Sequence, residues 1–145
     1  SGTVSAAREG TFRGINSIAI SLDADSNIDY KPSKTISKEI VKSVLKNRLP
    51  SDTFLNVTIP NLDKDEIKGF KITRQGSMYF SDNFEKIRNS RGLKGYWLTA
   101  DHHDPDPSKD CDSVAVREGY VSVTPLHSEQ TNFKFIDELS AWNLN

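Results

Sequence analysis

The sequence has little of several features that define whole classes of protein. Its 145 residues include one cysteine, Cys111, so no internal disulfide can form, which fits a reducing compartment such as the cytoplasm. No segment approaches the roughly 18 to 20 apolar residues that cross a bilayer, and the first residues lack a secretion-signal pattern. Because the 19 basic residues are balanced by 20 acidic ones, the protein has no general positive field that would attract polyanions. We therefore expect a cytoplasmic protein that binds neither a nucleic-acid polymer nor a membrane.

What is present fits a single globular domain. With 35% apolar and 27% charged residues, a chain of this length can bury a core of its own. The chain starts at Ser1, without an initiator methionine, and leads almost directly into a predicted helix. We therefore expect that it is part of a longer protein.

Hydrophobic spacing in the first half predicts alternating helices and strands. The expected elements are a helix at 1–10, a strand at 15–22, a helix at 36–49 capped by Thr35, and strands at 54–59 and 67–73. The small side chains of the first helix favour close packing on a sheet, and the first strand has one bulky and one small face. The segment 23–34 is expected to be a loop. A strand, helix and strand of these lengths are typical of a βαβ crossover.

The second half predicts a long β-hairpin arm, further strands and a final helix. We expect arm strands at 77–88 and 93–99, strands at 114–116 and 119–126, and a helix at 133–142. The arm is rich in aromatic residues, among them Tyr79, Tyr96 and Trp97. Because an isolated two-stranded ribbon is marginally stable in water, we expect a second subunit to support it. These aromatic side chains serve packing in our interpretation, and stacking on a nucleobase is the alternative.

Three blocks occur together in an order and separation typical of one family: SGTVSAAREG at 1–10, IKGFKITRQ at 67–75 and AVREGYVSVTPL at 115–126. Between them lie GINSIAIS and LNVTIP. Together these segments resemble the SurE-type nucleotidases over most of the chain. The family commonly has proline where Asn16 stands, which is a minor departure.

The resemblance implies a Rossmann-like, three-layer α/β fold with a projecting hairpin and a C-terminal element for assembly. It divides the chain into part of the α/β core at 1–75, the hairpin arm and acidic loop at 76–113, and strands with an oligomerisation helix at 114–145. It implies a homodimer or homotetramer formed through the arm and the final helix. The implied activity is hydrolysis of nucleoside monophosphates, sometimes also of short polyphosphate, with a divalent cation, Mg or Mn, as cofactor.

The chain departs from the family pattern at its start. The family's metal-binding Asn-Asp-Asp-Gly segment, its metal-binding serine and the asparagine-bearing, glycine-rich loop before Ser-Gly-Thr have no counterpart here. The resemblance therefore implies metal ligands upstream of Ser1 and an inactive chain when it stands alone. No catalytic residue is assigned within it.

The candidate phosphate-binding residues are Ser1, Gly2 and Thr3. A helix start offers free backbone N–H groups, and glycine lets an anion approach the main chain. From the tripeptide alone, ordinary capping by Ser1 or Thr3 is the better interpretation. The family resemblance reverses this preference in favour of phosphate binding.

Other residues invite functional interpretations that we weigh against structural ones. The run 101–106, Asp-His-His-Asp-Pro-Asp, contains metal-ligand side chains, but adjacent histidines on an extended chain diverge, and prolines make the segment a loop. We expect a solvated acidic loop there. His127 is a proton donor or a strand-end residue, and we favour the structural role because no partner is near in sequence. Arg117 and Glu118 are expected to form at most an exposed ion pair at a turn.

A second hypothesis comes from a different class of protein. In it, the chain is a non-catalytic oligomerisation or binding module, and the arm and final helix provide the function. Stable dimers of this chain without any metal requirement would favour the module over the phosphatase.

Overall fold

A four-stranded mixed sheet forms the centre of the molecule in the computed structural model, which describes residues 1–24 and 28–144. The strand order is β1-β2-β6-β3. Strands β1 (Ile18–Asp23) and β2 (Thr53–Pro60) are parallel. Strand β6 (Val121–His127) runs antiparallel to β2, and the short edge strand β3 (Phe70–Ile72) is parallel to β6.

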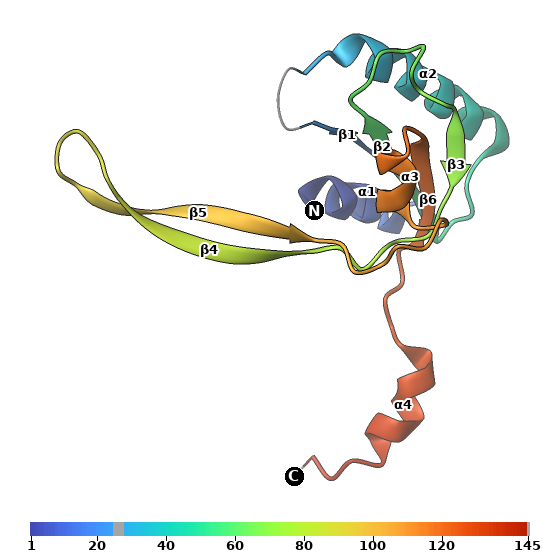
Figure 1. Cartoon of the computed structure of the whole chain (residues 1–145). Coiled ribbons are helices and arrows are strands. Elements are labelled where there is room, and N and C mark those ends of the chain that lie inside the picture. Colours follow the sequence, from blue (N-terminus) through green and yellow to red (C-terminus); the bar gives the residue numbers. More distant parts are fainter. Residues whose placement is uncertain (25–27, 145) are drawn as a thin grey trace.

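Two helices cover opposite faces of this sheet, which gives three layers (Figure 1). Helix α2 (Tyr30–Asn47) connects β1 to β2 and buries its isoleucines against the bulky face of the sheet. Helix α1 (Gly2–Phe12) packs Ala7 against Ala19 and Phe54 on the other face. The predicted α/β class, the βαβ unit and the small packing face of the first helix are thus confirmed.

Helix α2 begins earlier than the sequence predicted. Asp29, and not Thr35, is its N-cap, and the Asp29 side chain accepts a hydrogen bond from the Lys31 amide at 2.9 Å. Pro32 lies in the first turn, where the backbone N–H groups have no helical partner, so its missing N–H costs nothing. The expected loop at 23–34 was therefore wrong from Tyr30 onward, and its residues 25–27 lie outside the described part.

The residues expected to form a strand at 114–116 are helical. They belong to α3 (Asp112–Arg117), in which Val114, Ala115 and Val116 are all buried. A helix of six residues with three buried in succession is too short to show an amphipathic period, so its β-branched residues imitate a strand. Gly119, with a φ of 87°, reverses the chain from α3 into β6.

The predicted arm is present and projects far from the sheet (Figure 1). It consists of β4 (Tyr79–Arg88) and β5 (Lys94–His103), which pair only with each other. Strand β5 continues to His103, so residues 101–103 are part of the ribbon and not of the expected loop. Large apolar side chains along the arm are exposed: Tyr79, Phe84, Ile87, Tyr96, Trp97 and Leu98.

Helix α4 (Phe133–Ser140) follows β6 and extends away from the sheet (Figure 1). None of its residues is buried, although its apolar side chains gather on one face. Phe135 and Trp142 make an edge-to-face contact at 5.7 Å, which orders the end of this segment. No helix within 1–24 and 28–144 is long and apolar enough to span a membrane.

Candidate functional site

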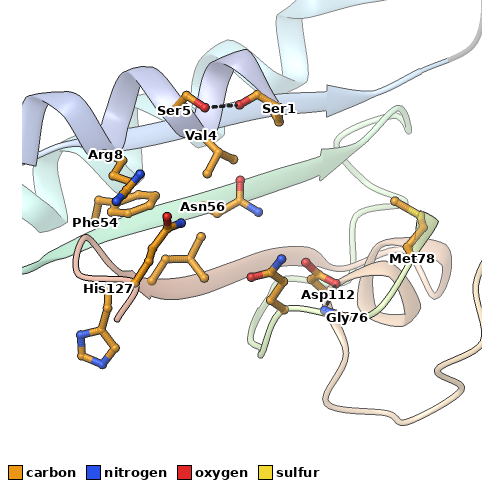
Figure 2. Close-up of a pocket in the computed structure, with 13 residues that line it drawn as sticks. Ser1, Val4, Ser5, Arg8, Phe54, Asn56, Gly76, Met78, Asp112 and His127 are labelled. Atoms are coloured by element: carbon orange, nitrogen blue, oxygen red, sulfur yellow. Dashed lines mark hydrogen bonds between the residues drawn. The ribbon is translucent and has the colours of Figure 1, made fainter. Parts of the chain in front are cut away.

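A pocket of about 540 Å³ lies beside α1, over the face of β2 and β6 (Figure 2). Residues of the loop after β3 and the start of α3 line its other side. Figure 2 shows Ser1 and Asp112 toward one end and Arg8 and His127 toward the other. The pocket is therefore elongated, and its two ends carry different chemistry.

The first end is the start of α1. Ser1 is the N-cap but makes no side-chain capping bond, and its carbonyl accepts from the Ser5 amide and hydroxyl at 3.1 and 3.0 Å. The first amides of a helix have no partner within it and carry its partial positive charge. A Cβ built on Gly2 meets no atom within 4 Å, so the main chain is open to a ligand.

The three predicted phosphate-binding residues differ in their position relative to the pocket. Ser1 lines the pocket, while Gly2 and Thr3 are exposed on the same first turn without lining it. The capping alternative finds no support at Ser1, which forms no side-chain capping bond.

Arg8 brings a permanent positive charge to the second end of the pocket. Its Nε donates to the Ser128 carbonyl at 2.8 Å, and its guanidinium lies 5.0 Å from the centre of the Phe12 ring. Within the described ranges no carboxylate forms an ion pair with it. Hydrogen bonds from Thr131 are the main cause that lowers the pKa of Glu129, and the Arg8 charge adds to that effect.

Arg8 was missed by the sequence interpretation, although a signal existed. Positions 1, 4, 5 and 8 share one face of a helix, and all four residues line the pocket. An arginine on the same helix face as a candidate anion site is a second candidate for ligand contact.

His127 has a partner that lies far away in sequence. Its Nδ1 is 3.2 Å from Oδ2 of Asp52, and the Asp52 carbonyl accepts from the Ser128 amide at 2.7 Å. The Thr53 hydroxyl is the first cause that lowers the pKa of Asp52, and His127 contributes less. Since β6 ends beside the start of β2, these contacts lie at the second end of the pocket, which His127 lines.

Asp112 is the single carboxylate among the residues that line the pocket in the described part of the chain. Its Oδ1 accepts from the Gly76 and Ser113 amides at 2.9 and 2.8 Å, so it ties the loop after β3 to α3. No group of three or more metal-ligating side chains occurs among residues 1–24 and 28–144. The described residues therefore do not fit a divalent-metal site by themselves.

Several side chains of the acidic loop form ion pairs. Arg74 binds Asp106 at 2.7 Å and Asp110 at 3.0 Å. The hydrogen bond from Arg74, followed by those from Ser108, holds the pKa of Asp106 well below its usual range. Arg117 binds Asp104 at 3.0 Å and Glu118 binds Lys71, so the two neighbours do not form the ion pair that the sequence allowed.

The arm residues of the Asp-His-His run make contacts within the ribbon. His103 stacks on Tyr79 with a centroid distance of 5.0 Å, and its Nε2 is 2.9 Å from the Ser81 hydroxyl. Asp101 accepts from the Asn83 amide group at 2.9 Å. The side chain of His102 lies outside the described residues.

Comparison with known proteins decides the family. The family model described as survival protein SurE matches residues 1–82. The chain belongs to the SurE family. It is 45% identical over 146 residues to the 5'-nucleotidase SurE of Christiangramia forsetii, covering 100% of the chain and 56% of that protein. It is 43% identical over 139 residues to the 5'-nucleotidase SurE of Aquifex aeolicus, covering 96% and 55%.

The fold agrees with a solved member of the SurE family. The crystal structure of the SurE protein from Aquifex aeolicus superposes with a TM-score of 0.78 at 43% identity, over 97% of this chain and 56% of that one. The resemblance and the fold class expected from the sequence are thereby confirmed. The chain spans about half the length of the curated relatives it matches, 56% for the first of them.

Proposed function

We propose that this chain is part of a phosphatase that hydrolyses nucleoside monophosphates, and that the start of α1 binds the phosphate group. The observation that carries the proposal is the pocket that has the uncapped α1 start, with Ser1, at one end. Relatives that are named 5'-nucleotidase SurE align with the whole chain, which supports a nucleotide as substrate.

The chemistry of the α1 start suits a phosphate. Its first amides point out of the helix along the dipole, and a phosphate at such a position is stabilised by several N–H donors at once. The Ser1 hydroxyl adds a donor that no cap uses. These groups bind and orient the phosphate, and they stabilise the charge that grows on its oxygens during hydrolysis.

A divalent cation, Mg or Mn, belongs to the proposal as cofactor. When bound, it would withdraw electron density from the phosphate and lower the pKa of an attacking water. Because the described residues do not fit a metal site, we assign no ligand in this chain and derive no step through the metal. Short polyphosphate is an additional proposed substrate, and the cytoplasm, supported by the free thiol of Cys111, is the proposed location.

Phosphate release from nucleoside monophosphates tests the function. The complete gene product that contains these residues is assayed with Mg or Mn, and again with a chelator. Loss of one hydrogen bond to a charged group costs about 1.5–3 kcal/mol, so Ser1→Ala should lower kcat/KM at least about tenfold. Ser43→Ala on α2, whose hydroxyl is exposed, is the matched control.

Two results would contradict the proposal. One is the absence of phosphate release with either cation. The other is a Ser1→Ala enzyme that matches the Ser43→Ala control.

We also propose that the arm and α4 mediate a homodimer or homotetramer. Exposed Trp97 and Leu98 on the arm, together with the unburied apolar face of α4, support this assembly. Trp97→Glu should shift the mass measured by light scattering toward the monomer. The charge-conserving control Asp82→Glu, on the same ribbon, should leave the mass unchanged.

A further inference from the structure

The pocket continues well beyond the reach of a phosphate bound at the α1 start. Arg8 is seven residues after Ser1, which is about 10.5 Å along a helix at 1.5 Å per residue. A volume of about 540 Å³ falls within the range of pockets that hold whole small molecules. A phosphate at Ser1 therefore leaves the Arg8 end free for another part of the same substrate.

Apolar side chains line the pocket between its two ends. Val4 of α1, Phe54 of β2 and Leu126 of β6 contribute there, and Phe54 and Leu126 are direct partners across the two strands. The ring faces of a nucleoside are largely apolar and suit such a surface, whereas the edges of the base carry the hydrogen-bonding groups. Along the pocket, the phosphate donors, the apolar wall and the cation come in the same order as the phosphate, the sugar and the base of a nucleotide.

The guanidinium at the far end is held in position. The hydrogen bond from Arg8 Nε to the Ser128 carbonyl and the contact with the Phe12 ring fix the plane of the guanidinium. Its Nη groups make no hydrogen bond with the described residues. The guanidinium group of arginine has only hydrogen-bond donors, and its fork of N–H groups matches two neighbouring acceptors. Guanine offers such a pair, O6 and N7, whereas adenine offers a donor and an acceptor at the same edge.

We propose that Arg8 is a specificity-determining residue that binds the O6 and N7 acceptors of a 6-oxopurine, so that guanine and hypoxanthine nucleotides are preferred over adenine nucleotides. This inference rests on the proposed function, because it places the phosphate at Ser1. Gln130 also lines the pocket, and its amide presents a donor and an acceptor that suit the adenine edge, so the proposed preference for 6-oxopurines is assigned to Arg8 alone.

The experiment compares four substrates in the complete gene product: GMP, IMP, AMP and p-nitrophenyl phosphate, which has no base. Arg8→Met keeps the aliphatic stem and removes the fork. Discrimination by a bidentate pair is worth about 1–3 kcal/mol, so kcat/KM for GMP and IMP should fall about 5- to 150-fold. The values for AMP and p-nitrophenyl phosphate should change less than about twofold. Arg13→Met, at the exposed end of the same helix, is the control.

A second variant separates the fork from the charge. Arg8→Lys keeps the positive charge but loses the planar pair of donors, so the GMP to AMP ratio should fall as it does in Arg8→Met. A Lys variant that keeps the wild-type ratio would overturn the inference. So would an equal fall for all four substrates, because that would assign Arg8 to the phosphate or to the fold. Tripolyphosphate is assayed as a fifth substrate, and a loss of its hydrolysis with an unchanged GMP to AMP ratio would assign Arg8 to a second phosphate and reject base recognition.

Failure of the proposed function gives a different result. A wild-type protein that releases phosphate from none of the substrates contradicts the phosphatase itself. Base recognition is then measured by calorimetric binding of GMP and AMP. Tighter GMP binding that disappears in Arg8→Met supports it, and equal binding of both nucleotides by the wild type overturns it.

Discussion

Gly2→Ala separates the effect of the first turn of α1 on stability from its effect on phosphate binding. The substitution adds one methyl group at a helical position, since Gly2 is not among the glycines with positive φ, and no atom lies within 4 Å of the new Cβ. Alanine also reduces the freedom of the unfolded chain. The free energy of unfolding should therefore stay constant or rise by about 0.4–1 kcal/mol.

The same methyl group would stand where a phosphate approaches the main chain. Moving the anion outward weakens at least one charge-assisted hydrogen bond, which is worth about 1.5–3 kcal/mol. The expected result is a 10- to 150-fold fall in kcat/KM for nucleoside monophosphates in a protein that melts no earlier than the wild type. Phosphate release and thermal unfolding are measured on the same preparation, so stability serves as the internal control. Full activity in Gly2→Ala would refute close approach of phosphate to this turn.

Three further substitutions test the scaffold around the pocket. Phe54→Ala removes a phenyl ring that is 2% exposed and should lower the free energy of unfolding, measured with urea, by about 3–5 kcal/mol. A loss below about 1 kcal/mol would contradict the packing of α1 on β2. Thr73→Val removes a buried hydroxyl that is 2.8 and 2.7 Å from two hydroxyls of β6, and should cost about 1–3 kcal/mol unless water replaces it. Asp52→Asn should flatten the acid limb of the stability curve, because the lowered pKa of Asp52 gives stability above about pH 4 that is lost as pH falls through the folded value. An unchanged acid limb in thermal melts from pH 2 to 6 would exclude that contribution.

Local periodicity was sufficient to predict the helices that pack on one side and the strands whose two faces carry different side chains. The small residues of α1 indicated close contact with a sheet, and Ala7 does pack against Ala19. The alternation of side chains along β1 and β2 predicted both strands, because the two faces of the sheet pack against different helices. Periodicity failed for α3, where Val114, Ala115 and Val116 are buried in succession and the helix is too short to show its period.

Half of the candidate site was beyond any local pattern. The α1 start could be proposed from Ser1 and Gly2, because a helix end and its free amides are local features. The pair of His127 and Asp52 joins residues 75 positions apart, and the Arg8 contact with Ser128 joins residues 120 apart. Such pairs depend on which strands become neighbours, and the insertion of β6 between β2 and β3 has no signature within any single segment.

The position of β6 explains why one pocket joins two kinds of chemistry. Its antiparallel pairing with β2 places Leu126 opposite Phe54 and brings Ser128, the first residue after the strand, within reach of both α1 and Asp52. A slip of one residue in this pairing would turn Leu126 to the other face and move the carbonyl that holds Arg8. Ser1 makes none of these contacts, although Val4 of the first turn packs with Leu126 against the cluster of Ala7, Ala19 and Phe54. Disturbing the β2–β6 pairing should therefore lower base selectivity more than it weakens phosphate binding at Ser1.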